Sequence, residues 1–180
     1  MRQACWKNRR YSMEEQKEVK KQKYVTFMSG KECFGLKIEY VNEIIVLQEI
    51  TVIPETEDYI KGLINLRGKI IPVIDVRLRF RQEPFEYNDR TCIIVINVNS
   101  TVVGLIVEKI AEVVEISEEN LMPSPTIAKQ VKSQQDRYVY AIGKVGDSVK
   151  LLLDPDKLLH DDMVILEQVS GESEADDTEE

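Results

Sequence analysis

The chain has one histidine, His160, and three cysteines, none of which form a CxxC pair. Zinc sites and nucleophile–base pairs are built largely from these two residue types, so their scarcity speaks against a metal centre or a catalytic triad. His160 stands beside two aspartates and is interpreted as a surface residue. Neither GxGxxG nor a GxxxxGKS/T loop occurs, which excludes the common phosphate-binding loops. The sequence therefore predicts no enzyme, no cofactor and no metal.

Long hydrophobic runs are missing as well. No apolar stretch approaches the roughly 20 residues of a membrane-spanning helix, and residues 1–23 lack the apolar segment of a signal peptide. We therefore expect a cytoplasmic protein without direct membrane insertion. The odd number and wide spacing of Cys5, Cys33 and Cys92 agree with reduced thiols, and the last two stand in apolar patterns typical of core strands.

Charge is concentrated at the two ends of the chain. The net charge is -8, yet residues 1–23 carry +5 and residues 161–180 carry -9. Nucleic-acid binding depends on clustered lysine and arginine that neutralise phosphates, so an acidic chain of this kind is not expected to bind nucleic acid. We expect a flexible basic arm over residues 1–23 and a disordered acidic tail within residues 161–180.

The part between these ends contains an internal duplication. Residues 34–45 match residues 103–114 at a constant offset of 69, with the glycine and both glutamates in register. Residues 59–75 match residues 138–154 without gaps at an offset of 79. One longer loop before the second match accounts for the difference, because loops tolerate changes of length. Two copies at this period indicate a duplicated subdomain and not a solenoid.

Each copy contains about five short β-prone runs separated by turn residues, without a long helical pattern between them. The predicted fold is all-β, with two tandem small five-stranded SH3-like β-barrels and a C-terminal helix. The barrels span about residues 24–88 and 89–160, and the sequence leaves open whether strands are exchanged between them. Asp154 followed by Pro155 marks the start of the helix, which the apolar spacing extends to about residue 168.

The segment 59–75, YIKGLINLRGKIIPVID, predicts a tight β-hairpin with a polar tip from Asn65 to Gly68. Pro72 has no amide donor, so we place its strand at a sheet edge or a barrel corner. Gly62 is assigned to close packing in preference to positive φ, because its counterpart in the second copy is Ala141.

The strings FGLKIEYVNEII, YIKGLINLRGKIIPVIDVRLRF and VVGLIVEKIAEVVEI, in this order and spacing, closely resemble the CheW family, the bacterial chemotaxis coupling proteins. The resemblance runs from about residue 24 to residue 159, and GLINLRGKIIPVID at 62–75 is its most specific part. It implies two five-stranded barrels with a hydrophobic core between them. It also implies a non-catalytic adaptor that couples chemoreceptor tips to the histidine kinase CheA and helps to build receptor arrays.

The resemblance implies two docking surfaces. Receptor helices are expected in a groove between the barrels, at Val41, Glu43, Ile44, Arg67 and Ile110, with Val25, Ile38, Gly62 and Asn65 as further candidates. The kinase is expected at Val52, Ile53, Pro54 and Leu66. Since Val41 and Ile110 are equivalent residues of the two copies, they are expected to face one another across a pseudo-twofold seam.

Glu43 and Arg67 match two family positions at which charge matters for coupling. A guanidinium beside a carboxylate can form a bidentate pair, which would pin the hairpin tip to the strand that carries Glu43. Arg67 is replaced by Gly146 in the second copy, whereas Glu43 keeps its counterpart in Glu112. This asymmetry favours a functional task for Arg67.

The expected partners are the regulatory domain of CheA and the cytoplasmic hairpin tip of a methyl-accepting chemoreceptor. The protein is expected in the cytoplasm, recruited to membrane-anchored receptor arrays, and self-association in array rings stays open. Two alternatives are a small-barrel nucleic-acid-binding module and a regulatory-domain-like subunit of another kinase pathway. The first would require aromatic residues in a basic groove, which the charge pattern does not favour.

Overall fold

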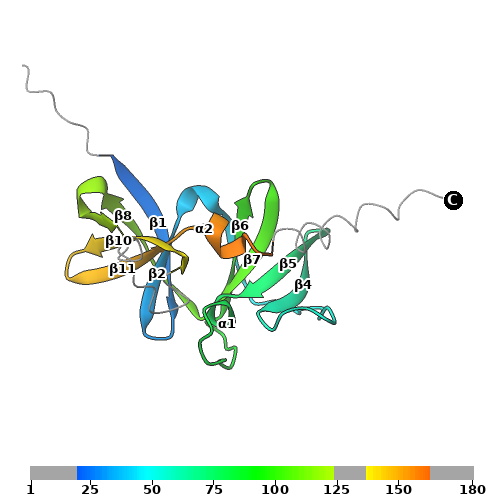
Figure 1. Ribbon diagram of the computed structural model, residues 1–180. Helices are drawn as coiled ribbons and strands as arrows, with labels where there is room; N and C mark the ends of the chain where they lie inside the picture. The colour runs from blue at the N-terminus through cyan, green and yellow to red at the C-terminus, as the bar shows by residue number, and fades with distance from the viewer. Residues whose placement is uncertain (1–19, 124–136, 163–180) are drawn as a thin grey trace, which may run out of the picture.

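The computed structural model describes residues 20–123 and 137–162, and these residues form two β-sheets with two short helices. Figure 1 shows the six-stranded sheet on the left, the β4–β5 part of the five-stranded sheet on the right, and helix α2 between them. The all-β prediction with a duplicated body is confirmed. The basic arm before residue 20 and the acidic tail after residue 162 lie outside the described residues.

Each sheet combines strands from both sequence copies. The six-stranded sheet has the order β8 (Lys109–Ser117), β1 (Lys21–Ser29), β2 (Glu32–Lys37), β11 (Ser148–Leu153), β10 (Val139–Val145) and β9 (Leu121–Pro123). The five-stranded sheet has the order β3 (Val41–Val46), β6 (Cys92–Val98), β7 (Thr101–Val107), β5 (Lys69–Asp75) and β4 (Ile60–Leu66). The boundary near residue 88 separates the two copies, and both sheets exchange strands across it.

Short helical segments lie at the ends of strands. The helices are α1 (Val76–Arg79) and α2 (Pro155–Leu159), and the single 3-10 turns are η1 (Ile38–Tyr40) and η2 (Glu118–Asn120). Asp75 and Asp154 cap the two α-helices, since each carboxylate accepts two backbone amides of the first turn. The predicted helix start at Asp154 is confirmed. The predicted end near residue 168 lies outside the described residues.

The hairpin between β4 and β5 forms as predicted. Arg67 and Gly68 occupy the two turn positions with φ of 54° and 87°, which is the left-handed geometry that two-residue hairpins require. The side-chain oxygen of Asn65 accepts the amide of Gly68 at 2.8 Å and closes the turn. The tip is therefore a rigid platform for the side chain of Arg67.

Pro72 does not mark an edge strand. Its strand, β5, lies between β4 and β7, so the prediction of a sheet edge is wrong for the strand as a whole. Pro72 pairs with Leu63 on the β4 side, and the registered pairs with β7 begin only at Val73. The missing amide donor is tolerated because the ladder on the β7 side starts one residue later.

Gly62 satisfies two requirements at once. Its φ is 134°, and a Cβ atom built there would lie 2.0 Å from the carbonyl oxygen of Thr51. The close packing assigned from the sequence is present, but the preference for packing over positive φ is wrong, because both conditions hold. A bulge in the β4–β5 ladder falls between Ile60 and Gly62, and it brings Thr51 into backbone pairing with Leu63.

Three hydrophobic cores hold the body together. The first is enclosed by the five-stranded sheet and includes Ile64, Val73 and Ile93. The second is enclosed by the six-stranded sheet and includes Ile116 and Leu152. The third and largest lies between the sheets and is centred on aromatic and branched side chains: Phe27, Phe34, Phe80, Ile94, Leu105, Tyr138 and Leu158. This last core agrees with the expectation of a hydrophobic core between two barrels. The strand orders place β3 and β4 at the ends of one sheet, and β8 and β9 at the ends of the other.

Candidate docking surface

The described part of the chain carries no group of three or more metal-ligating side chains, and His160 is exposed. A cavity of about 470 Å³ among the described residues is lined partly by charged side chains of both signs, including Glu57, Arg81 and Asp161.

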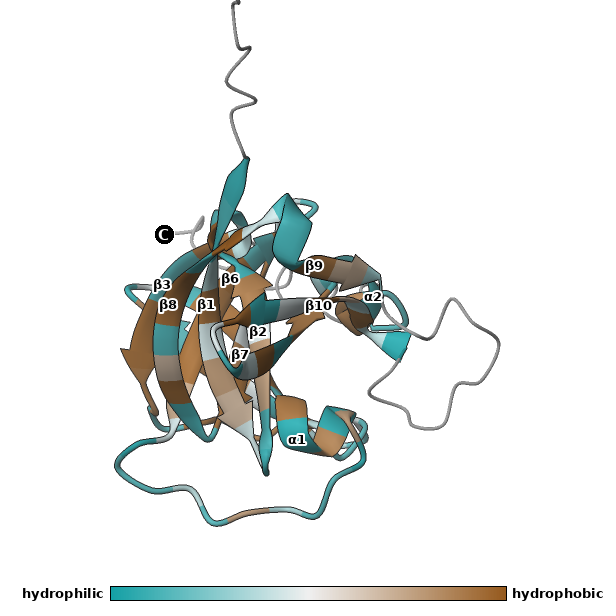
Figure 2. Ribbon diagram, turned by 90° about the vertical axis from the view of Figure 1, so that its left-hand side faces the viewer, coloured by the Kyte–Doolittle hydropathy of each residue, from teal (hydrophilic) through white to brown (hydrophobic). Residues whose placement is uncertain are grey.

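Val41 and Ile110 meet the same core. Val41 begins β3 and Ile110 is the second residue of β8, and both side chains are partly buried against the cluster between the sheets. Figure 2 shows the face of the molecule on which β3 and β8 run, with hydrophilic and hydrophobic bands alternating along β8. The duplication thus places two equivalent apolar residues at the seam.

A second pair of equivalent residues on β3 and β8 is exposed to solvent. Ile44 on β3 is 40% exposed, and its counterpart at the offset of 69, Val113 on β8, is 56% exposed. Edge strands that present large apolar side chains to solvent are unusual in a monomer and are typical of binding surfaces. Val113 was missed in the sequence analysis. Applying the offset of 69 to Ile44 would have found it.

The ion pair predicted between Glu43 and Arg67 is present and bidentate. The Nη1 and Nη2 atoms of Arg67 donate to the two carboxylate oxygens of Glu43 at 3.3 and 2.9 Å. The pair joins β3 to the β4–β5 hairpin, and these are the two ends of the five-stranded sheet, so it closes the barrel at the surface. The Arg67 side chain is 78% exposed. The pair therefore contributes about 1 kcal/mol or less to folding.

The remaining receptor candidates differ in accessibility. Ile38 and Asn65 are exposed, and Asn65 is engaged in the turn hydrogen bond to Gly68. Val25 and Gly62 are buried, Val25 in the core between the sheets, so neither residue is available for contact with a partner in this structure. The candidate docking surface therefore comprises Val41, Glu43, Ile44, Arg67, Ile110 and Val113.

The candidate kinase surface lies along β4. Val52 is 75% exposed, Pro54 is exposed, and the pairing of Thr51 with Leu63 holds this segment against the strand. Leu66 is partly buried and packs into the barrel core. Gly62 lies beneath Thr51, so its function in this structure is to let the apolar segment 52–54 rest on the sheet.

Tyr24 with Tyr140, and Lys150 with Glu112 and Cys33, form polar pairs on the six-stranded sheet. Burial and the hydrogen bond between the Tyr140 and Tyr24 hydroxyls raise the pKa of Tyr140 well above its usual range. Burial opposes the charged form of Lys150, but hydrogen bonds to Glu112 and Cys33 outweigh it and raise the pKa of the lysine. Groups with these shifts stay in their ordinary protonation states near pH 7 and do not supply acid–base chemistry there.

Taken together, two barrels with exposed apolar edge strands and a surface ion pair are the architecture of a protein-binding adaptor. Comparison with known proteins identifies the family. The model of the CheW-like domain matches residues 23–163, and the chain therefore belongs to the CheW family of chemotaxis coupling adaptors.

Individual relatives agree with this assignment over most of their length. The chemotaxis protein CheW of Klebsiella aerogenes is 34% identical over 150 residues, which cover 83% of this chain and 89% of the relative. The CheW protein of Bacillus subtilis is 32% identical over 77% of this chain and 86% of its own. The crystal structure of the scaffolding protein TtCheW from Thermoanaerobacter tengcongensis aligns with a TM-score of 0.69 at 35% identity, covering 75% of this chain and 90% of that chain.

These comparisons bear on the alternatives and on the membrane. Neither a nucleic-acid-binding module nor a subunit of another kinase pathway is supported by the matches. Among residues 20–123 and 137–162, no helix has the length and apolar character needed to cross a bilayer.

Proposed function

We propose that this chain joins the cytoplasmic hairpin tip of a methyl-accepting chemoreceptor to the regulatory domain of the histidine kinase CheA. The receptor helix lies along the seam defined by Val41, Ile44, Ile110 and Val113. The kinase domain contacts the segment 52–54. The protein works in the cytoplasm at membrane-anchored arrays and contributes no catalytic group.

The observation that carries the proposal is the pairing of equivalent apolar residues on the two outer strands. Val41 and Ile110 pack against the core between the sheets, and Ile44 and Val113 expose apolar side chains on the same two strands, β3 and β8. An amphipathic helix presents apolar residues three and four positions apart along one face, and an apolar surface on two strands can bury such a face. The exposed Glu43–Arg67 pair beside the groove offers charged groups for orienting the helix.

The kinase surface is supported by a separate observation. Val52 is among the most exposed large apolar side chains of the described residues, and it stands on a segment pinned to β4 by backbone hydrogen bonds of 2.8 Å. A rigid segment that exposes a few apolar side chains suits a small, transient interface with another barrel. Because the two surfaces use different strands, one chain can hold both partners together.

The test is a co-sedimentation experiment with a receptor cytoplasmic fragment and CheA, followed by measurement of kinase autophosphorylation. We expect the full chain to bring both partners into one complex and to change the kinase activity. Ile44→Glu should abolish receptor binding. Val149→Glu is the matched control, because Val149 is similarly exposed and lies outside both surfaces. Failure of the unmodified chain to co-sediment or to change kinase activity would contradict the proposal.

A further inference from the structure

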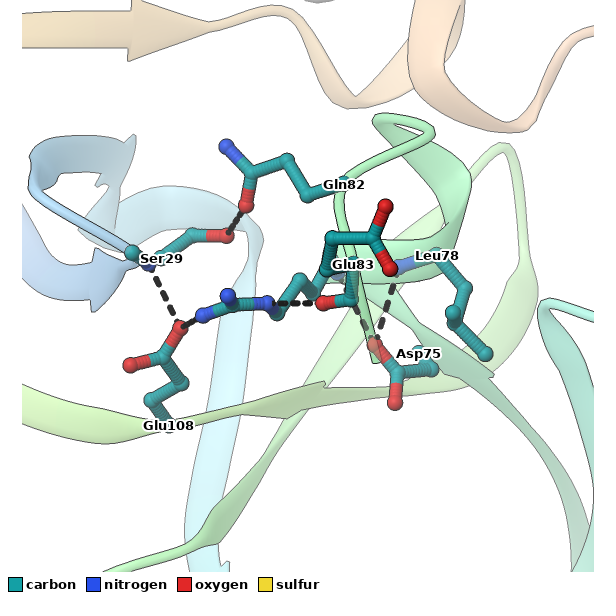
Figure 3. Close-up of polar contacts among 8 residues, drawn as sticks. Ser29, Asp75, Leu78, Gln82, Glu83 and Glu108 are labelled. Atoms are coloured by element: carbon teal, nitrogen blue, oxygen red, sulfur yellow. Dashed lines mark hydrogen bonds and ion pairs between the residues drawn. The ribbon is translucent and has the colours of Figure 1, made fainter. Parts of the chain in front are cut away.

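One carboxylate oxygen joins three segments of the chain at the junction of the two sheets. The Oε1 atom of Glu108 accepts the backbone amide of Gly30 at 2.5 Å and also forms an ion pair with Nη1 of Arg77. The Nε atom of Arg77 donates to the carbonyl oxygen of Glu83. Figure 3 shows this junction, with a second link from the Ser29 hydroxyl to the Gln82 side chain at 2.7 Å. The two charged side chains are mostly buried.

The junction residue Glu108 comes in the chain just before Ile110, a residue of the candidate docking surface. Glu108 is the residue at which the chain leaves β7 of one sheet and enters β8 of the other, and Ile110 follows two residues later. Arg77 belongs to α1, which follows β5, and Gly30 forms the turn between β1 and β2. The position of Ile110 is therefore tied to elements of both sheets through one side chain.

The strand ladder alone does not set this position. A bulge interrupts the pairing of β1 with β8 between Thr26 and Phe27, so the first residues of β8 follow a different register from the rest of the strand. At the bulge, the Thr26 hydroxyl donates a hydrogen bond of 2.7 Å to the carbonyl oxygen of Glu112. Beyond the bulge, only two registered pairs, Phe27 with Ile110 and Met28 with Lys109, precede the bond from Gly30 to Glu108. A short ladder of this kind needs a further anchor at its end.

The equivalent place in the other copy is built differently. Gly30, Arg77 and Glu108 correspond to Asn99, Asp156 and Glu39 at the offsets of 69 and 79. Asn99 donates to Asp156 at 2.8 Å, so a link from hairpin to helix exists in both copies. Glu39 instead forms an exposed ion pair with Lys37 at 3.5 Å. The charged three-way junction is thus found on the Ile110 side, and the Val41 side has an open, solvated counterpart.

From these contacts we infer that Glu108 and Arg77 are positioning residues for receptor docking, which hold the start of β8 so that Ile110 faces the groove. This inference rests on the proposed function for its docking half. On this inference, the junction holds in place the side of the docking surface that carries Ile110. Among the described residues, Val41 packs against the core between the sheets, and the start of its strand has no comparable buried ion-pair junction.

The structural half is tested by amide hydrogen exchange of the full chain, followed residue by residue by NMR. In Glu108→Ala the amides of Gly30 and Ile110 should exchange at least about tenfold faster, because the anchor is lost. Glu39→Ala is the matched control at the equivalent position and should leave both rates unchanged. Glu108→Gln keeps an acceptor for Gly30 and removes the charge opposite Arg77, so it should give an intermediate effect if Glu108→Ala folds poorly. Unchanged exchange in both Glu108 variants would overturn the inference.

The docking half is tested by the affinity of the same variants for a chemoreceptor hairpin-tip fragment. Glu108→Gln and Arg77→Lys should each lower the affinity about three- to tenfold at temperatures well below the melting transition. Glu39→Ala should bind like the unmodified chain. Faster exchange with unchanged affinity would overturn the positioning role. No binding by the unmodified chain would overturn the proposed function and the docking role together, and the exchange data would still decide whether the anchor exists.

Discussion

Tyr59 and Tyr138 are equivalent residues of the two copies, and the guanidinium of Arg79 lies over both rings, 4.7 and 5.0 Å from their centroids. Its Nε atom donates at 3.1 Å to the carbonyl oxygen of Leu158, which is the counterpart of Arg79 itself at the offset of 79. Arg79 therefore lies near the pseudo-twofold axis that relates the two halves. Its partner Asp162, with Nη2 and Oδ2 3.2 Å apart, also accepts the Tyr59 hydroxyl at 2.6 Å.

Replacing Arg79 should destabilise the fold strongly. The side chains of Arg79 and Asp162 are 9% and 4% exposed, so Arg79→Met would leave a buried carboxylate without its cation. We expect a loss of about 3–5 kcal/mol in the free energy of unfolding, measured by urea denaturation. Asp161→Asn removes the exposed partner of the same arginine and should cost less than about 1 kcal/mol. Equal effects of the two changes would contradict the central role of Arg79.

Gly62→Ala should destabilise the first hairpin. The new Cβ atom would overlap the carbonyl oxygen of Thr51 and would hold alanine at a φ of 134°. The expected loss is about 2–4 kcal/mol in the free energy of unfolding, measured by urea denaturation. The Ala141→Gly variant tests the counterpart position and should cost only about 1 kcal/mol, as expected of a lost methyl group and added chain freedom.

Arg67→Ala should separate binding from stability. The pair with Glu43 is largely exposed on the arginine side, so the melting temperature should hardly change. Affinity for the receptor fragment, measured by calorimetry, should fall severalfold because the charged groups beside the groove are lost. Lys69→Ala, a change to an exposed residue of the same hairpin, is the control. A drop in stability above about 2 kcal/mol would indicate that the pair is structural.

The free energy of unfolding should fall in alkaline solution. Burial, followed by hydrogen bonds to Asp162, Asp75 and Tyr24, raises the pKa of Tyr59, Tyr87 and Tyr140 in the folded chain. A group with a raised folded pKa stabilises the protein below its unfolded pKa, here about 10, and this contribution is lost as the pH rises above that value. The slope is up to about 1.4 kcal/mol per pH unit for each tyrosine, reduced by partial solvation.

Urea denaturation between pH 8 and pH 11 measures this slope. Tyr140→Phe should flatten the profile above pH 10, because one group no longer ionises in the unfolded chain. An unchanged slope would show that Tyr140 ionises equally in both states. The Tyr11→Phe variant is a suitable control, since Tyr11 belongs to the basic arm that is predicted to be flexible from sequence.

Much of the fold could be predicted because it repeats. The offsets of 69 and 79 align strands and turns, and they pair Val41 with Ile110, both of which pack against the core between the sheets. The Glu43–Arg67 pair was predictable because a rigid hairpin presents the arginine. Repetition shows which residues are equivalent, however, and says nothing of which strands pair. The exchange of strands between the sheets therefore stayed open until the structure was known.

Other contacts had no signal in the sequence. Glu108 and Arg77 are 31 residues apart, and Arg79 and Asp162 belong to different copies, so their contacts depend on how the two sheets pack. Pro72 was placed at an edge because the absence of an amide was considered without the one-residue delay of the β7 ladder. The positive φ of Gly62 was missed because Ala141 occupies the equivalent place at the same ladder bulge without a positive φ.

The exchange of strands has a consequence for the origin and the dissection of the molecule. It is the topology expected of a strand-swapped dimer of one half whose two chains are joined end to end. A fragment that stops at residue 88 keeps β3, β4 and β5 but loses their neighbours β6 and β7, so neither fragment owns a complete sheet. Separated halves should stay unfolded alone and regain structure when mixed.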